Sequence, residues 1–258
     1  MLHGGITLRQ TDGERLEERL AMTIDGLRAL DADVIALQEA SAGPTRGNVA
    51  ARVAAALGYD HVRAPAGYRW IGRMAAWATG FDEGPALLTR LPILATETID
   101  VAACGEWYGR TAACAVLQAP AGAIRVCSTH VSGNACQLAD LGETLAARRD
   151  ARPLVLMGDL NSTPDSPGLR SLIDRLGLVD AFGVANPDAP GFTVYQPVRE
   201  STRMARRRVD YVLVAGTTTP RVRSSRVVLD APGQGGDGRP LWPSDHYGVV
   251  AEIDLSSN

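Results

Sequence analysis

The chain has 258 residues, a formal net charge of −3 and 45% apolar residues. A chain of this length buries about 75% of its unfolded surface. The ordinary apolar fraction and small charge exclude an intrinsically disordered protein. No stretch approaches the roughly 20 apolar residues that a membrane helix needs, so we expect no transmembrane segment. All 26 basic residues other than histidine are arginine, which excludes a lysine nucleophile, a Schiff base and a phosphate-loop lysine.

The N-terminal part is predicted to begin with a helix, a strand and a second helix. Thr11 and Glu14 have the spacing of a capping box, and apolar residues at helical spacing predict a helix over residues 13–30. The apolar run at 34–37 predicts a buried strand, and an Ala-rich helix is expected over 47–57. No basic segment followed by an apolar one precedes them, so we expect no secretory signal in this chain.

The rest of the chain is predicted to mix strands with interleaved helices. Strands are expected at residues 59–63, 68–77, 85–89, 93–101, 112–118, 123–130, 154–157, 209–214 and 247–253. Helices are expected over 134–148 and from Ser166, where a serine N-cap precedes Pro167. Stretches 183–206 and 230–243 are rich in Gly, Pro and Arg and are expected to be loops beside a site. With no linker and no internal repeat, we expect one domain over residues 1–258.

Four polar clusters stand where apolar runs end. They are Gln38-Glu39, Gly158-Asp159-Leu160-Asn161, Arg208-Val209-Asp210-Tyr211 and Ser244-Asp245-His246. Each cluster alone is more often a solvated strand end or a turn. Together, their carboxylates, amide and histidine would suit Mg²⁺ or Mn²⁺, which prefer oxygen ligands. The same groups could orient an attacking water and stabilise charge on a phosphoryl oxygen.

In this order, the clusters resemble the endonuclease/exonuclease/phosphatase superfamily, which includes deoxyribonuclease I. The matching segments are Asp33–Glu39, Gly84–Ile93, Thr129-His130, Gly158–Asn161, Arg208–Val212 and Ser244–His246. The resemblance implies an α/β fold, a four-layer sandwich of two mixed β-sheets flanked by helices. It also implies metal-dependent hydrolysis of a phosphate ester by in-line attack of water, with a nuclease-like phosphodiesterase as the first hypothesis. A phospholipid or inositol-phosphate hydrolase of the same fold is the alternative, and a catalytically inactive binding module is the alternative from another class.

The resemblance assigns the metal and water positions of the site. Glu39 would be the principal ligand of Mg²⁺ (or Mn²⁺), and Asp245 would lie beside the metal. Asp159 would orient or deprotonate the attacking water. Asn161 would hold that water or a phosphoryl oxygen.

The remaining candidates are expected to contact the substrate. By the same resemblance, His246 would contact the scissile phosphate, Asp210 would fix the tautomer and charge of His246, and His130 would contact phosphate or assist the leaving group. Arg208 lies in an arginine-rich run, which either grips substrate phosphates or compensates acidic neighbours. His3 either reaches the site or is an ordinary loop residue.

The chain departs from the family pattern at its N-terminus. Family members usually begin with an internal strand that ends in a metal-site Asn, whereas this chain begins Met1-Leu2-His3-Gly4-Gly5. Loss of an internal strand should expose sheet edges and apolar surface. Either the natural protein begins upstream of Met1, which we favour, or it lacks this residue.

Four cysteines allow three pairings. Cys104 and Cys114 flank a predicted hairpin loop, and Cys127 and Cys136 flank a loop that contains His130. We therefore expect two local disulfides, Cys104–Cys114 and Cys127–Cys136, with four reduced buried thiols as the alternative. Disulfides favour an exported protein and reduced thiols a cytoplasmic one. We expect a monomer that acts on a phosphate ester, with nucleic acid among the candidate substrates.

Overall fold

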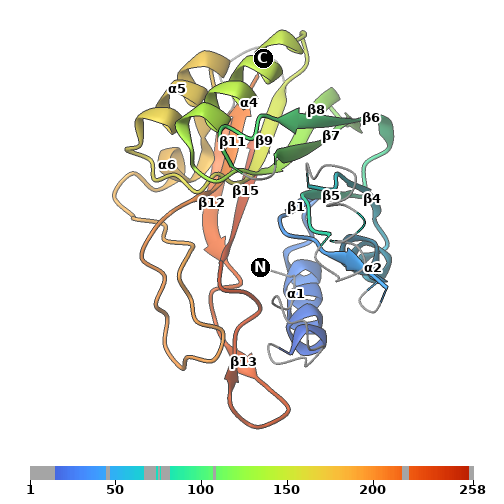
Figure 1. The fold of residues 1–258 in the computed structure, drawn as a ribbon, viewed down its shortest axis with the longest axis vertical. Helices are drawn as coiled ribbons and strands as arrows, with labels where there is room; N and C mark the ends of the chain where they lie inside the picture. Colours follow the sequence, from blue (N-terminus) through green and yellow to red (C-terminus); the bar gives the residue numbers. More distant parts are fainter. Residues whose placement is uncertain are drawn as a thin grey trace.

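Two β layers pack face to face in this protein, and helices cover both outer faces (Figure 1). The computed structural model describes residues 15–44, 47–66, 74, 76, 82–106, 109–216 and 221–255. Within these residues, no helix is both long enough and apolar enough to cross a lipid bilayer.

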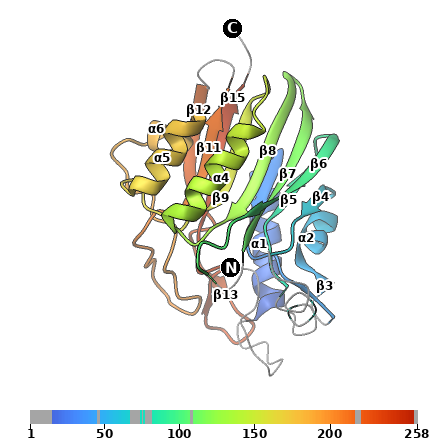
Figure 2. The ribbon, with the colours of Figure 1, turned by 45° about the horizontal axis from the view of Figure 1, so that its top comes forward.

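The larger sheet has six strands in the order β10-β11-β9-β8-β7-β6. Their bounds are β6 Ile93–Val101, β7 Arg110–Ala119, β8 Gly122–His130, β9 Leu154–Asp159, β10 Val179–Asp180 and β11 Asp210–Ala215. β8 and β9 are parallel, and every other neighbouring pair in this sheet is antiparallel. The parallel pair needs a crossover connection, which contains helix α4 (Ala135–Ala147). Figure 2 shows α4 and α5 (Pro167–Leu176) on one face of this sheet.

The second β layer consists of two antiparallel pieces. One has the order β1-β5-β4, and the other pairs β12 with β15. Their bounds are β1 Val34–Leu37, β4 Asp60–Arg63, β5 Ala86–Thr89, β12 Arg221–Val228 and β15 Gly248–Asp254. Helices α1 (Leu16–Leu30) and α2 (Val49–Leu57) lie outside the first piece. The short elements are β2 Ala42–Gly43, β3 Gly47–Asn48, α6 Ala181–Ala185, β13 Gly233–Gln234 and β14 Pro240–Leu241.

Three apolar clusters fill the spaces between these layers. Leu138 and Leu172 pack against Leu156 under α4 and α5. Between the two β layers, Val126 and Val212 of the larger sheet share a cluster with Leu87 of β5 and Val249 of β15. A third cluster, which includes Leu20, Val53 and Leu88, lies beneath α1 and α2. The layers therefore follow the order helix, sheet, sheet, helix, and the predicted four-layer α/β sandwich is confirmed.

Local signals in the sequence account for most element boundaries. The Ser166 side chain accepts a hydrogen bond from the backbone N–H of Leu169, which confirms the predicted start of α5. Gly58 ends α2 in the left-handed conformation, which glycine adopts without a steric penalty. The predicted capping box at Thr11 and Glu14 lies outside the described residues. Of the strand expected at 68–77, only Met74 and Ala76 are described, and both are helical.

The predicted disulfide pairing is wrong. The bonds join Cys104 to Cys136 and Cys114 to Cys127. Cys114 and Cys127 are direct partners in the β7–β8 register, with Cα atoms 4.1 Å apart, so they face each other across the hairpin. Cys104 follows β6 and lies beside the N-terminal turn of α4, where it meets Cys136. Spacing along the chain could not show which strands pair.

Candidate active site

Three neighbouring strands of the larger sheet carry polar residues at the same edge. β8 ends at His130, β9 ends at Asp159, and β11 begins at Asp210. His130 is the register partner of Asp159, and Asp159 is the register partner of Asp210. Backbone pairing therefore brings one histidine and two carboxylates side by side, although they are far apart in sequence.

Two glycines allow the close approach that this arrangement requires. Gly158 has φ 150°, and a Cβ at this position would overlap the carbonyl oxygen of Thr129 on β8. Gly133 has φ 80°, and its Cβ would overlap the carbonyl oxygen of Asn161. The Gly-Asp-Leu-Asn motif therefore contains its glycine because another side chain would push β8 away from β9.

Asp210 and His246 form a hydrogen-bonded pair. The His246 Nδ1 atom lies 3.0 Å from Asp210 Oδ2, and its Nε2 lies 4.0 Å from Asp159 Oδ2. Burial opposes protonation of His246, but the hydrogen bond and charge of Asp210 raise its pKa above the ordinary value. Burial also raises the pKa of Asp159 to about 7, and the charge of Asp210 acts in the same direction.

His130 and Asn161 lie on the other side of Asp159. Asn161 Nδ2 lies 3.2 Å from both His130 Nε2 and Asp159 Oδ2, and it donates to the Val131 carbonyl at 2.8 Å. The backbone N–H of Asn161 donates to Asp159 Oδ1 at 2.8 Å. Asn161 has φ 48°, a conformation that Asn tolerates better than most residues. This turn fixes the orientation of Asp159, which is only 5% exposed.

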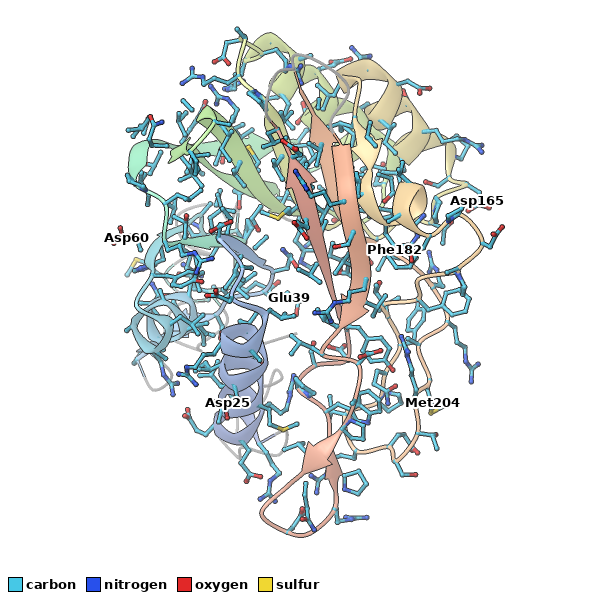
Figure 3. All side chains as sticks on the ribbon, turned by 180° about the vertical axis from the view of Figure 1, so that it is seen from behind. Asp25, Glu39, Asp60, Asp165, Phe182 and Met204 are labelled. Atoms are coloured by element: carbon cyan, nitrogen blue, oxygen red, sulfur yellow. A yellow bond between two sulfur atoms is a disulfide. The ribbon has the colours of Figure 1, made fainter. Side chains whose placement is uncertain are left out.

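Glu39 comes to the site from the second β layer, directly after β1. Its Oε1 lies 3.8 Å from His130 Nδ1. Two contacts tie this strand end to β8, because Gln38 Nε2 donates to the Ser128 hydroxyl, which donates to the Leu37 carbonyl. Burial raises the pKa of Glu39 to about 8, and the charges of Glu83 and Asp245 add to this effect. Figure 3 shows Glu39 between the segment that contains α1 and the C-terminal strands.

The donor set fits a divalent cation. Asp159, Asp210 and His246 each offer a ligand atom, and these atoms all lie within 4.8 Å of one another. Glu39 and Asp245, the two predicted metal ligands, border this group, because the charge of Asp245 acts on Glu39 and the charge of His246 acts on both. The raised pKa values of Glu39 and Asp159 mean that their carboxylates are costly to ionise without a cation. Mostly carboxylate oxygens favour Mg²⁺ or Mn²⁺ over softer metals.

The predicted substrate residue Arg208 is not among the residues brought together here. Its guanidinium is buried, lies 2.6 Å from Asp180 Oδ2 and stacks on the rings of Phe182 and Tyr211. Other arginines of the same run are also paired, since Arg199 contacts Asp237 and Arg203 contacts Asp230. The structure therefore favours the compensating role over phosphate binding for these arginines.

Two further charged residues border the site but were not predicted from the sequence. Arg110, at the start of β7, has its Nη1 atom 3.4 Å from His130 Nδ1. Glu83 is 6% exposed, and burial raises its pKa, whereas the charge of Arg110 lowers it. Both stand where a polar segment meets an apolar strand, the same signal that identified the four clusters. His3 lies outside the described residues.

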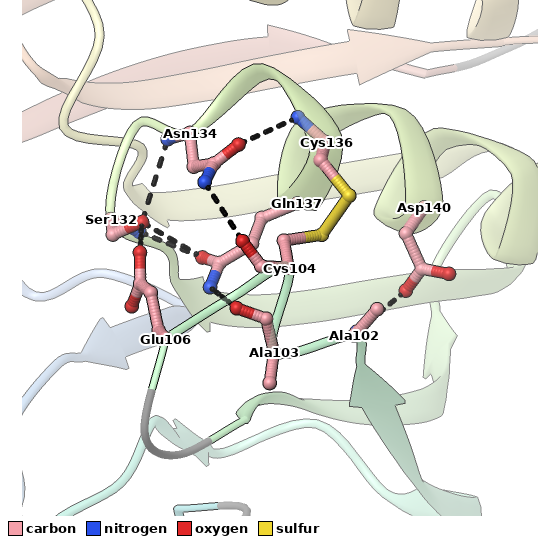
Figure 4. The surroundings of a disulfide bond; sticks show 9 residues. All are labelled: Ala102, Ala103, Cys104, Glu106, Ser132, Asn134, Cys136, Gln137 and Asp140. Atoms are coloured by element: carbon pink, nitrogen blue, oxygen red, sulfur yellow. Dashed lines mark hydrogen bonds between the residues drawn. A yellow bond between two sulfur atoms is a disulfide. The ribbon is translucent and has the colours of Figure 1, made fainter.

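The loop after His130 is braced by a disulfide and a hydrogen-bond network (Figure 4). The Cys104–Cys136 bond joins the segment after β6 to α4. Asn134 caps α4 by accepting from the Cys136 N–H, and its amide donates to the Cys104 carbonyl. Gln137 accepts from the Ser132 N–H at 3.0 Å. This bracing limits the freedom of the loop that begins at His130.

Comparison with known proteins agrees with this geometry. The model of the Endonuclease/Exonuclease/phosphatase family matches residues 2–246. The chain belongs to this family. A search of curated proteins found no match.

Solved structures of this family share the fold at low sequence identity. An endonuclease/exonuclease/phosphatase family protein from Leptotrichia buccalis has a TM-score of 0.70 at 19% identity, covering 98% of this chain and 97% of its own. The mannosyl-6-phosphatase Bt3783 of Bacteroides thetaiotaomicron has a TM-score of 0.70 at 16% identity, with coverage of 92% and 91%. D. rerio TDP2, complexed with a single-strand DNA product, has a TM-score of 0.69 at 15% identity, with coverage of 94% of each chain. Identities this low establish the fold and leave the substrate open.

Proposed function

We propose that this family member is a Mg²⁺- or Mn²⁺-dependent phosphoester hydrolase that uses direct attack by water, with phosphodiesters as the first candidate substrates. The observation that supports this most is the convergence of Asp159, Asp210 and His246 within 4.8 Å of one another, at the strand edge that also holds His130. Two carboxylates and a hydrogen-bonded histidine in a buried setting are the groups that such a reaction uses.

Each residue has a chemical task in this proposal. A divalent cation held beside Glu39 and Asp245 would polarise a phosphoryl oxygen and offset negative charge. Asp159 accepts a proton from the attacking water, whose oxygen bonds to phosphorus as the ester P–O bond breaks. Asn161 donates a hydrogen bond to that water or to a phosphoryl oxygen.

The two histidines serve the phosphate. Asp210 raises the pKa of His246, so the protonated form persists to higher pH and places positive charge against a phosphoryl oxygen. His130, beside Arg110, assists departure of the leaving oxygen. The neighbours named above act on a sugar phosphate and on DNA, so both monoesters and diesters belong in the first assay.

The decisive experiment is hydrolysis of bis(p-nitrophenyl) phosphate and of p-nitrophenyl phosphate, with Mg²⁺, with Mn²⁺ and with chelator. We expect turnover that requires a divalent cation and is lost in Asp159→Asn and in His246→Gln. Asp165→Asn, an exposed carboxylate beyond the site, is the matched control and should retain turnover. Turnover that persists in chelator, or in Asp159→Asn, would contradict the proposal.

A further inference from the structure

The second β layer contains a slot between its two pieces. Among the described residues, β1 pairs with β5 alone and β15 pairs with β12 alone, so each strand has one edge with no strand beside it. A cavity of about 590 Å³ separates these edges, and residues 33–39 and 248–253 line its two sides. The slot is therefore bounded by two rows of backbone groups rather than by side chains alone.

The other two walls of the slot are mainly apolar. Val126, Val155 and Val212 of the larger sheet line one wall. Leu27 and Leu30 of α1 line the opposite wall. An occupant would therefore lie within the layered core, with apolar surroundings above and below.

The dimensions of the slot fit one strand. A strand residue takes roughly 3.3 Å along the chain, 4.8 Å between strands and 10 Å between packed layers, or about 160 Å³. A cavity of about 590 Å³ then holds about four such residues. β1 itself has 4 residues, so an added strand of this length would match its neighbour.

We propose that this slot binds an extended apolar peptide segment, which adds as a β-strand between β1 and β15. Its N–H and C=O groups pair with both open edges, and its side chains point alternately to the larger sheet and to α1. A small apolar molecule would leave two rows of backbone donors and acceptors buried without partners, which is costly. A peptide backbone satisfies both rows, as in other cases of strand addition.

The same slot reaches the candidate active site. Glu39, Asp159, Asp210 and His246 line one end of the cavity. An added strand would therefore end beside these residues and fix the separation of β1 from β15. The binding inference does not rest on the proposed hydrolase function, because it can be measured without turnover.

The test uses a fluorescein-labelled hexapeptide, acetyl-Arg-Val-Ile-Val-Val-Arg-amide, on the full chain. We expect saturable binding by anisotropy and at least about tenfold slower amide exchange in both residues 34–37 and 248–253. The same peptide with alternate amides N-methylated keeps its apolar side chains but loses the donors for one edge, so it should bind at least about tenfold more weakly.

A pair of protein variants locates the binding. Ala251→Arg places a large side chain on β15 in the slot and should abolish binding, whereas Ala95→Arg on the exposed edge strand β6 should not change it. Circular dichroism shows whether each variant folds, and the N-methylated peptide keeps the test valid if Ala251→Arg does not.

Three results would overturn the proposal. One is equal affinity for the two peptides, and another is protection of β6 or of only one slot edge. The third is strong protection of both edges before peptide is added, which would mean that the chain's own segment or a second copy fills the slot. Concentration-dependent size in light scattering separates these last two occupants.

Discussion

The two β layers of this protein differ in continuity, and each supplies one part of the candidate site. The larger sheet is continuous from β10 to β6, and its register alone aligns His130, Asp159 and Asp210. The second layer is in two pieces, and it contributes Glu39 from the end of β1 and His246 from just before β15.

This difference shows which distances in the site are firmly held. Asp159 and Asp210 are fixed by direct strand pairing. Glu39 and His246 instead stand on opposite sides of the slot, so their separation depends on how β1 and β15 are spaced. The part of the site in the larger sheet should therefore be rigid, and the part in the second layer should respond to whatever changes the slot.

The largest predicted effect is loss of activity on changing Asp159, at the centre of the rigid part. Asp159→Asn removes the proposed proton acceptor and a buried charge next to Asp210. We expect kcat to fall by about 10³-fold, because general-base and electrostatic contributions are each of this order. Stability in chelator should be equal or higher, because one buried carboxylate is no longer ionised. Urea unfolding measured beside the kinetics separates this result from simple misfolding, which would lower both.

The next effect is a pH dependence of metal-free stability. The pKa values of Glu39 and Asp159 are raised to about 8 and about 7 in the folded protein, so the folded state holds more protons than the unfolded state between about pH 4 and 8. Stability from these groups is full below the unfolded pKa values and is lost as the pH rises through the folded ones. His246, whose pKa is also raised, acts in the same direction at higher pH.

The measurement is urea unfolding in chelator at pH 5 and pH 8. We expect the protein to be less stable at pH 8, by up to about 4 kcal/mol, since three pKa units correspond to about that free energy. Glu39→Gln should flatten this dependence, and Mg²⁺ should restore stability more at pH 8 than at pH 5. A stability that rises from pH 5 to pH 8 in chelator would contradict the assigned burial of these carboxylates.

The local parts of the fold were predictable from the sequence, and the pairing of distant segments was less so. Apolar periodicity at 34–37 and the Ser166-Pro167 pair gave the correct elements because both signals are local. The strand at 221–228 was missed because arginine and serine interrupt its apolar residues. Most of the site followed from polar residues at strand ends, but Arg110 has no such motif around it. The disulfide pairing was wrong because strand register, not spacing, decides it.

The corrected disulfides allow a matched comparison between the rigid sheet and the loop after His130. The Cys104–Cys136 and Cys114–Cys127 bonds span 32 and 13 residues, so chain entropy predicts that removing either costs about 3 kcal/mol, with slightly more for the longer loop. We expect the double variant Cys104→Ser/Cys136→Ser also to lower kcat, because this bond braces the loop that follows His130. Cys114→Ser/Cys127→Ser should reduce stability with kcat per folded molecule unchanged. Equal kcat in the two double variants would show that the brace does not position His130.

The smallest predicted effect concerns Arg208, which lies under the chain segment leading into β11. Replacing it with methionine leaves the buried carboxylate of Asp180 without its partner and removes stacking on Phe182 and Tyr211. We expect a stability loss of about 2 kcal/mol, below the range for a fully buried pair because Asp180 is partly exposed. Because the guanidinium is directed at Asp180, kcat and KM should change little. Asp180→Asn should cause a similar stability loss, and the double variant less than the sum, because the two residues stabilise each other. A selective rise in KM for Arg208→Met at unchanged stability would instead assign this arginine to phosphate binding.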